Sequence, residues 1–202
     1  MTLSTPLYVL RHGETAWNTE RRMQGMRDSN LTERGRLQAG AMGRTLAREL
    51  AGTTRPTVFL RSPLGRARET AAIIGREIGL DPGQWRDDPR LVELGYGAWE
   101  GLAWKDIEVT HPTALADWRA DPHGYCPPGG ETHNELRTRS AAVLADVVAS
   151  GARTVIVGHG VSGAVLRGLN LGLDARAMFV LEKPQDAFFR LLAGREERID
   201  CG

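Results

Sequence analysis

The sequence contains only two cysteines, Cys126 and Cys201, and they lie far apart in the chain of 202 residues. Two isolated cysteines provide neither a disulfide framework nor the closely spaced ligands of a zinc site. Lysine is also scarce, because Lys105 and Lys183 are the only lysines among the 26 basic residues. Arginine is therefore so frequent that a single arginine beside a motif is weak evidence for an anion-binding site.

The chain also lacks an excess of charge and long hydrophobic runs. Lys and Arg total 26 and Asp and Glu total 25, which leaves a formal net charge of +1. A balanced charge gives no overall attraction to nucleic acid or to an anionic membrane, so any anion site must be local. No apolar run approaches the ~20 residues of a membrane span, and the first residues do not resemble a secretory leader. We therefore expect a cytoplasmic protein without a nucleic-acid or membrane partner.

The distribution of glycine and proline indicates one domain over residues 1–202. The 24 glycines and 10 prolines are spread along the sequence, without a linker-like cluster or an internal repeat. Short apolar runs at 7–10, 58–60 and 154–157 each precede a polar loop, as buried parallel strands do. Helical patterns separate these runs, which predicts an α/β protein.

Helices are predicted over 33–50, 67–78 and 132–148. The first follows Thr32, a good N-cap residue, and we expect its buried face to carry Leu37, Met42, Leu46 and Leu50. We also predict a strand over 188–192, at an edge of the sheet.

The alternation of strands and helices predicts a three-layer α/β/α fold with a mostly parallel central sheet. Residues 102–130 fit no strand pattern, so we expect them to form a cap-like helical excursion over the active site. Ligands in such folds bind at the carboxyl ends of the strands. Polar clusters follow three predicted strands, namely Arg11-His12-Gly13, Arg61-Ser62 leading to Arg66, and Gly158-His159-Gly160. Two histidines and several arginines are thus expected at one edge of the sheet.

These clusters belong to a longer series of motifs that occur in a fixed order. The main blocks are Arg11-His12-Gly13-Glu14-Thr15 with Asn18, Arg22-Met23-Gln24-Gly25, Leu31-Thr32 with Gly35, Ser62-Pro63-Leu64 with Arg66-Ala67, Glu93 before Gly97-Ala98-Trp99-Glu100-Gly101, Gly129-Gly130-Glu131, and Gly158-His159-Gly160. The series resembles the signature of the histidine phosphatase (phosphoglycerate-mutase-like) superfamily. A single Arg-His-Gly would be weak evidence in an arginine-rich chain, whereas ordered blocks are specific.

The resemblance implies the roles of the catalytic residues. His12 would attack phosphorus and form a phosphohistidine, for which a neutral imidazole is well suited near neutral pH. Glu93 would act as the general acid and base, and His159 would donate to the phosphate in the transition state. Arg11 and Arg66 would bind the phosphate through forked hydrogen bonds.

Four further residues are candidates for the same pocket. Asn18 is expected to be a neutral donor to the phosphate, and Thr15, Gln24 and Gly25 are candidate substrate-binding residues. Because arginines supply the positive charge, the resemblance implies neither a metal ion nor a cofactor. The expected partner is a small-molecule phosphate ester, and a homodimer is compatible with the sequence because dimers are the commonest association.

Glu14 and Glu100 compete with Glu93 for the acid role, and physical chemistry alone does not separate the three carboxylates. Three activities also remain open. The favoured one is a phosphatase, since Trp99-Glu100-Gly101 follows the acid and His159 comes only 66 positions after Glu93. The alternatives are a cofactor-dependent phosphoglycerate mutase and a non-catalytic phosphate-binding domain.

The substrate is not determined by these motifs. Aromatic residues of the excursion either line the substrate site or form a small core of their own; they are Trp104, Trp118 and Tyr125.

Overall fold

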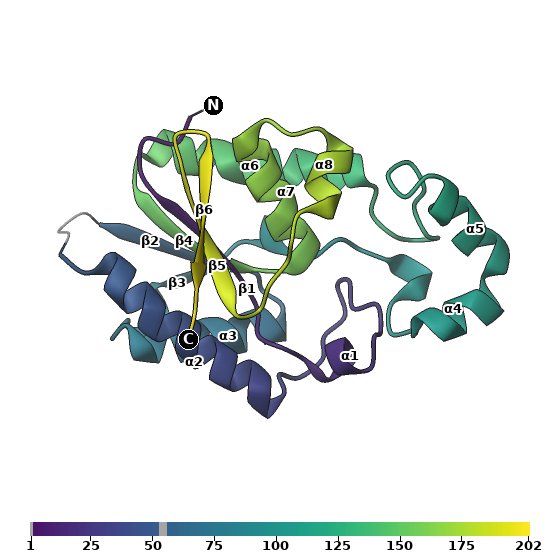
Figure 1. Ribbon diagram of the computed structural model, residues 1–202, viewed down its shortest axis with the longest axis horizontal. Helices are drawn as coiled ribbons and strands as arrows, with labels where there is room; N and C mark the ends of the chain where they lie inside the picture. Colours follow the sequence, from purple (N-terminus) through teal and green to yellow (C-terminus); the bar gives the residue numbers. More distant parts are fainter. Residues whose placement is uncertain (1, 53–55) are drawn as a thin grey trace.

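A six-stranded sheet in the order β3-β2-β4-β1-β5-β6 runs through the molecule (Figure 1). The computed structural model describes residues 2–52 and 56–202. The strands are β1 (Leu7–Arg11), β2 (Thr57–Arg61), β3 (Trp85–Asp87), β4 (Arg153–Gly158), β5 (Ala187–Leu192) and β6 (Arg195–Asp200). The first four strands pair in parallel, and β5 and β6 join the sheet in antiparallel orientation. The predicted mostly parallel sheet is confirmed.

The C-terminal part of the sheet differs from the prediction. β5 is not an edge strand, because it pairs with β1 on one side and with β6 on the other. β6 is rich in charged residues and therefore gave no apolar signal, although charge is common on edge strands because it discourages further pairing. The turn between them has positive φ at Ala193 and Gly194, 50° and 71°, as a tight hairpin requires.

Eight α-helices accompany the sheet in the described residues. They are α1 (Ala16–Thr19), α2 (Glu33–Leu50), α3 (Gly65–Glu77), α4 (Trp104–Thr110), α5 (Pro112–Ala120), α6 (His133–Ser150), α7 (Gly160–Leu171) and α8 (Ala175–Val180). Thr32 caps α2 by accepting from the Gly35 N–H, and Thr132 and Glu135 form a capping box at the start of α6. None of the helices within residues 2–52 and 56–202 has the length and apolarity needed to cross a membrane.

Alternate side chains of the strands pack on opposite faces of the sheet. Tyr8 and Leu10 of β1 belong to a core cluster with α2 and α3, whereas Leu7 and Val9 belong to one with α6 and α7. Successive residues of a strand point to opposite sides, so a strand buried on both faces contributes to both clusters. The predicted three-layer α/β/α arrangement is confirmed.

The buried face of α2 differs from the prediction at one position. Met42 and Leu46 are fully buried, but Leu37 is 70% exposed. A helix turns about 100° per residue, so Leu37 lies about 140° around the axis from Met42. The buried line continues toward the N-terminus through Ala39 instead.

Residues 102–130 contain α4 and α5, which lie beyond α1 at one end of the molecule (Figure 1). Their core is a separate cluster that includes Met23, Trp99, Ile107 and Leu115. The aromatic side chains of the segment join this cluster: the Tyr125 ring stacks on Trp99 with centroids 6.1 Å apart, and Trp118 lies 6.3 Å from Trp99 and 5.4 Å from Trp104. These contacts favour the small core over a substrate wall.

The two leucines on α2 provide a test of this packing. Leu46→Ala should lower the free energy of unfolding by about 2–5 kcal/mol, because it leaves a cavity in the layer between α2 and the sheet. Leu37→Ala is the matched control and should change it by less than about 0.5 kcal/mol, as is usual for an exposed position. Urea unfolding measures both values. Equal losses would contradict the described orientation of α2.

Candidate active site

The two predicted histidines lie side by side at the carboxyl ends of neighbouring strands. β1 and β4 pair in parallel with Arg11 opposite Gly158, and the next residue of each strand is a histidine. The His12 N–H donates to the Gly158 carbonyl at 3.0 Å, and the ring centroids of His12 and His159 are 5.2 Å apart. The register of one strand pair therefore builds the centre of the site.

Hydrogen bonds determine which nitrogen of His12 is free to react. Nδ1 lies 2.8 Å from the Gly13 carbonyl, which can only accept, so Nδ1 carries the hydrogen. Nε2 is then the unprotonated nitrogen, and it accepts from Arg66 Nε at 3.3 Å. Burial lowers the pKa of His12 well below its usual value, and the nearby Arg11 and Arg66 charges lower it further. The ring is therefore neutral, with its nucleophilic nitrogen beside an arginine.

The loop after His12 requires glycine because two backbones meet there. A Cβ on Gly13 would lie 2.2 Å from the Gly35 carbonyl oxygen, which leaves no room for any side chain. The Gly13 N–H donates to Thr70 Oγ1 of α3, and Thr70 in turn donates to the Arg66 carbonyl. The loop after His12 is thus fixed to the helix that carries Arg66.

Arg66 is buried, with 2% of its surface exposed, and the loop of residues 25–28 surrounds it. Its guanidinium donates to the Arg27 carbonyl at 2.6 Å, to Asp28 Oδ1 at 3.0 Å and to the Gly25 carbonyl at 2.7 Å. Gly25 has φ +54°, and a Cβ there would collide with the Glu100 carboxylate at 2.1 Å. Gly25 therefore lies at the site through its backbone, as an acceptor that orients Arg66.

Two buried nitrogens of the site have no hydrogen-bond partner among the described residues, Arg11 Nε and His159 Nδ1. Arg11 also donates to the Lys183 carbonyl, and His159 Nε2 lies 2.7 Å from Ser62 Oγ. Ser62 Oγ accepts from the Leu64 N–H and keeps its own hydrogen, with which it can donate to Nε2; the ring hydrogen is then on Nδ1. Buried donors are normally paired, so the unpaired Arg11 Nε–H favours an anionic ligand beside it.

Burial is the main cause of two further pKa shifts at the site. It lowers the pKa of His159 well below its usual value, and the charges of Arg66 and Arg11 act in the same direction. It also lowers the pKa of Arg11, although the negative charge of Glu93 opposes the change. An anion bound among these groups would offset the repulsion between their positive charges.

Glu93 belongs to the segment between β3 and α4, and its side chain lies beside the N-terminus of α7. The residue is 8% exposed. Its carboxylate accepts from the backbone N–H groups of Leu94, Val161 and Ser162 at 2.8–2.9 Å. These three hydrogen bonds fix the orientation of the carboxyl group. Arg139 holds the Glu93 loop, since it donates to three of its carbonyls and pairs with Glu131 at 2.6 Å.

The two competing carboxylates are engaged elsewhere. Glu14 accepts from the Thr32 hydroxyl at the start of α2. Glu100 accepts from the N–H groups of Met26 and Tyr96, which connects two loops. Glu93 therefore remains the candidate for the acid role, as its position in the motif series implies.

Asn18, Thr15 and Gln24 form one hydrogen-bonded group. Gln24 Nε2 donates to Thr15 Oγ1 at 2.8 Å, and the Thr15 hydroxyl and N–H both donate to Asn18 Oδ1 at 3.1 Å. Thr15 is fully buried and Gln24 is nearly so. These two residues are thus placed to orient Asn18.

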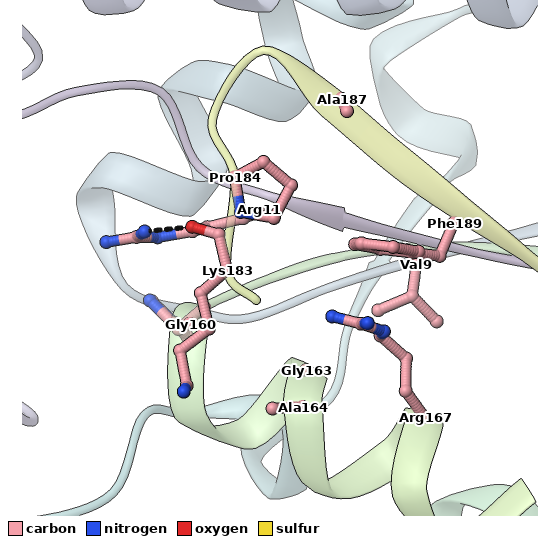
Figure 2. A pocket seen from close by; sticks show the side chains of 11 residues that line it. Val9, Arg11, Gly160, Gly163, Ala164, Arg167, Lys183, Pro184, Ala187 and Phe189 are labelled. Atoms are coloured by element: carbon pink, nitrogen blue, oxygen red, sulfur yellow. Dashed lines mark hydrogen bonds between the residues drawn. The ribbon is translucent and has the colours of Figure 1, made fainter. Parts of the chain in front are cut away.

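Two residues near the site had no motif to indicate them, Lys183 and Gln185 on the segment between α8 and β5. Figure 2 shows Lys183 and Pro184 packed beside Arg11, close to Gly160 at the start of α7. Lys183 could have been noticed as one of only two lysines, whereas nothing in the sequence distinguishes Gln185. Arg61 and Arg68, two other arginines near the motifs, both pair with Asp87.

Residues 7–197 match the family model of the histidine phosphatase superfamily (branch 1). The chain belongs to the histidine phosphatase superfamily. It is similar to glucosyl-3-phosphoglycerate phosphatase of Mycobacterium tuberculosis, with 40% identity over 144 residues, which are 71% of this chain and 60% of that protein. It is also similar to an Enterobacter protein named "Probable phosphoglycerate mutase", with 39% identity over 182 residues, 85% of this chain and 77% of that protein.

Solved structures show the same fold. A mycobacterial glucosyl-3-phosphoglycerate phosphatase in complex with VO3 superimposes with a TM-score of 0.82 and 29% identity, covering 98% of this chain and 100% of that one. An alpha-ribazole phosphatase from Shigella flexneri has a TM-score of 0.81 at 23% identity, covers 98% of this chain and 96% of that one, and supports the fold alone. The superfamily and fold predicted from the motifs are confirmed.

The buried histidines predict a pH dependence of stability. Unfolded, His12 and His159 bind protons below about pH 6.5, whereas in the fold their lowered pKa keeps them neutral. The unfolded state then binds more protons, so stability should fall as pH drops below about 6.5, by up to about 1.4 kcal/mol per pH unit for each histidine. Urea unfolding between pH 7.5 and 5 measures this slope. His159→Asn should reduce the slope, whatever it does to stability at pH 7.5, and an unchanged slope would contradict the neutral state of His159.

Proposed function

We propose that this protein hydrolyses small-molecule phosphomonoesters through a phosphohistidine formed at His12 Nε2. The observation that carries the proposal is a neutral, buried imidazole whose free nitrogen faces Arg66, close to nitrogens of Arg11 and His159 that have no partner among the described residues. Phosphoryl transfer spreads negative charge over the equatorial oxygens, so it needs positioned cations and an in-line nucleophile. The names of several relatives as phosphatases support the proposal.

In the first half-reaction, His12 Nε2 forms the new bond to phosphorus as the ester P–O bond breaks. Arg11 and Arg66 bind the phosphoryl oxygens, and His159 donates to one of them from Nδ1. Glu93 gives its proton to the departing oxygen, so the alcohol leaves neutral. The three backbone N–H groups at the Glu93 carboxylate stabilise the anion that remains. The Gly13 carbonyl stabilises the positive charge that develops on the His12 ring.

In the second half-reaction, water attacks the phosphohistidine. Glu93 accepts a proton from that water, the N–P bond breaks, and inorganic phosphate leaves. His12 returns to its neutral form and Glu93 to its protonated form, which balances the cycle. The chain's own arginines neutralise the phosphate in every step, so the proposal includes no cofactor. Within the described residues no group of three or more His, Cys, Asp or Glu side chains is arranged to hold a metal ion.

A phosphoglycerate mutase is the second candidate, because the Enterobacter relative carries that name. The two activities differ only in the acceptor of the phosphoryl group, which is water in one case and a second hydroxyl of the substrate in the other. The short chain between Glu93 and His159 supports water as the acceptor. A non-catalytic phosphate-binding domain has less support, because the chain retains His12, Glu93 and His159 together.

The proposal also covers organisation and substrate. We regard residues 1–202 as one cytoplasmic domain in which residues 102–130 form a cap that borders the leaving group. The similarity to glucosyl-3-phosphoglycerate phosphatases makes phosphorylated sugar acids the first substrates to assay. Release of phosphate from a panel of metabolite phosphates would identify the preferred ester.

The covalent intermediate is directly testable. Brief mixing with substrate labelled in the phosphoryl group, followed by an alkaline quench, should trap an acid-labile and base-stable label on His12. His12→Ala should abolish both the label and turnover. A variant that kept the wild-type rate would show that another residue is the nucleophile, and an isomeric phosphate ester formed faster than inorganic phosphate would favour the mutase.

The role of Glu93 is tested by varying the leaving group. Glu93→Gln keeps size and polarity but removes the proton, so phosphorylation by an alkyl phosphate should slow by roughly 10²- to 10⁴-fold. With an activated aryl phosphate, whose phenolate needs little protonation, the loss of phosphorylation rate should be much smaller. Arg66→Ala is the contrast. It should slow the reactions of both esters alike, since Arg66 binds the transferred phosphoryl group. Single-turnover rates measure these effects. Equal losses in Glu93→Gln would return the acid role to Glu14 or Glu100.

A further inference from the structure

Gln185 lies on the segment between α8 and β5 and contacts two parts of the site. Its Nε2 donates to the His12 carbonyl at 3.2 Å and to Asn18 Oδ1 at 3.1 Å. The His12 carbonyl can only accept, so this bond fixes the amide nitrogen of Gln185 toward the site. Both hydrogens of that nitrogen are then committed, one to the nucleophile loop and one to Asn18.

The segment that carries Gln185 is held on both sides. Arg11 donates to the Lys183 carbonyl, and the Cys201 N–H donates to the Asp186 carbonyl at 2.9 Å. Pro184 restricts the backbone directly before Gln185, because its ring fixes φ. The Gln185 amide is therefore presented from a segment that is anchored on both sides.

The hydrogen bonds around Asn18 all converge on one of its two terminal atoms. Asn18 Oδ1 accepts from the Thr15 N–H, from the Thr15 hydroxyl and from Gln185 Nε2, each at 3.1 Å. A backbone N–H can only donate, which identifies the acceptor as the oxygen of the amide. Asn18 Nδ2 makes no hydrogen bond to another residue in the described part of the chain, so its two hydrogens are available to a ligand.

Gln185 strengthens this orientation. A rotated Asn18 would place its NH2 group against the Thr15 N–H and the Gln185 amide, neither of which can accept. The Thr15 hydroxyl already accepts from the Asn18 N–H and from Gln24 Nε2, so its hydrogen is directed to Asn18 Oδ1 and it opposes the rotation as well. Without Gln185 only these local contacts with Thr15 would oppose the rotation, and a rotated Asn18 would present an oxygen to the phosphate.

We propose that Gln185 is a positioning residue that fixes the Asn18 amide so that Nδ2 donates to the phosphoryl group. The inference rests on the proposed function, in which Asn18 belongs to the phosphate pocket. Gln185 itself does not touch the phosphate. Its effect therefore passes through Asn18, and this distinguishes it from a residue that only supports the fold.

A double-mutant cycle with inorganic phosphate and vanadate as competitive inhibitors tests the proposal. Gln185→Met keeps the length of the side chain and removes its donors, and should weaken inhibition by roughly 2- to 12-fold, the range for one lost hydrogen bond. Gln185→Glu should weaken it more, because a carboxylate facing Asn18 attracts the NH2 group. Asp186→Asn, at the adjacent exposed position, is the matched control and should leave inhibition unchanged.

The Asn18→Ala background separates the outcomes. There, Gln185→Met should change inhibition by less than about twofold, because the group that it orients is gone. An equal loss with and without Asn18 would overturn the proposal and assign the effect to the His12 carbonyl. No loss in Gln185→Met, or none in Asn18→Ala, would overturn it as well. The proposed function is judged separately, by turnover and by the phosphoryl label on His12, and circular dichroism verifies that each variant folds.

Discussion

The parallel pairing of β1 with β4 is the constraint on which the rest of the structure depends. It places Arg11 opposite Gly158. The next residues, His12 and His159, are therefore neighbours, and the centroids of their rings are 5.2 Å apart. A shift of one residue in this register would turn the side chains of a strand to the other face. The pairing is specified strongly, because both strands bury apolar residues against helices on both sides.

Burial of charge at this edge of the sheet determines the chemistry. Arg11 and Arg66 lie around the buried His12, and together with burial they keep its ring neutral. The same burial makes the guanidinium groups costly unless they are paired, which the protein achieves with main-chain carbonyls from Gly25, Arg27 and Lys183 and with the Asp28 carboxylate. Carbonyls orient an arginine without cancelling its positive charge, whereas Asp28 offsets part of the charge of Arg66.

The elements with regular apolar patterns could be predicted from the sequence, and those that depend on long-range pairing could not. The helix over 33–50 and its Thr32 cap are encoded locally, and the structure confirms both. The error at Leu37 shows that spacing alone does not decide which side of a helix meets the sheet. β6 was missed because its six residues are mostly charged, and its strand conformation depends on its pairing with β5.

By itself the sequence determined the superfamily, the three-layer fold and the identity of the candidate residues, because motif order and strand-loop patterns are properties of the linear chain. Only the tertiary structure shows how Glu93, Glu14 and Glu100 are held, since partners of each come from distant segments: the start of α7 for Glu93, Thr32 for Glu14 and Met26 for Glu100. It also revealed Gln185, which is separated from Asn18 by 167 residues in sequence and meets it through a hydrogen bond of 3.1 Å. A hydrogen bond depends on the position of two atoms in space, and no local pattern in the chain records it.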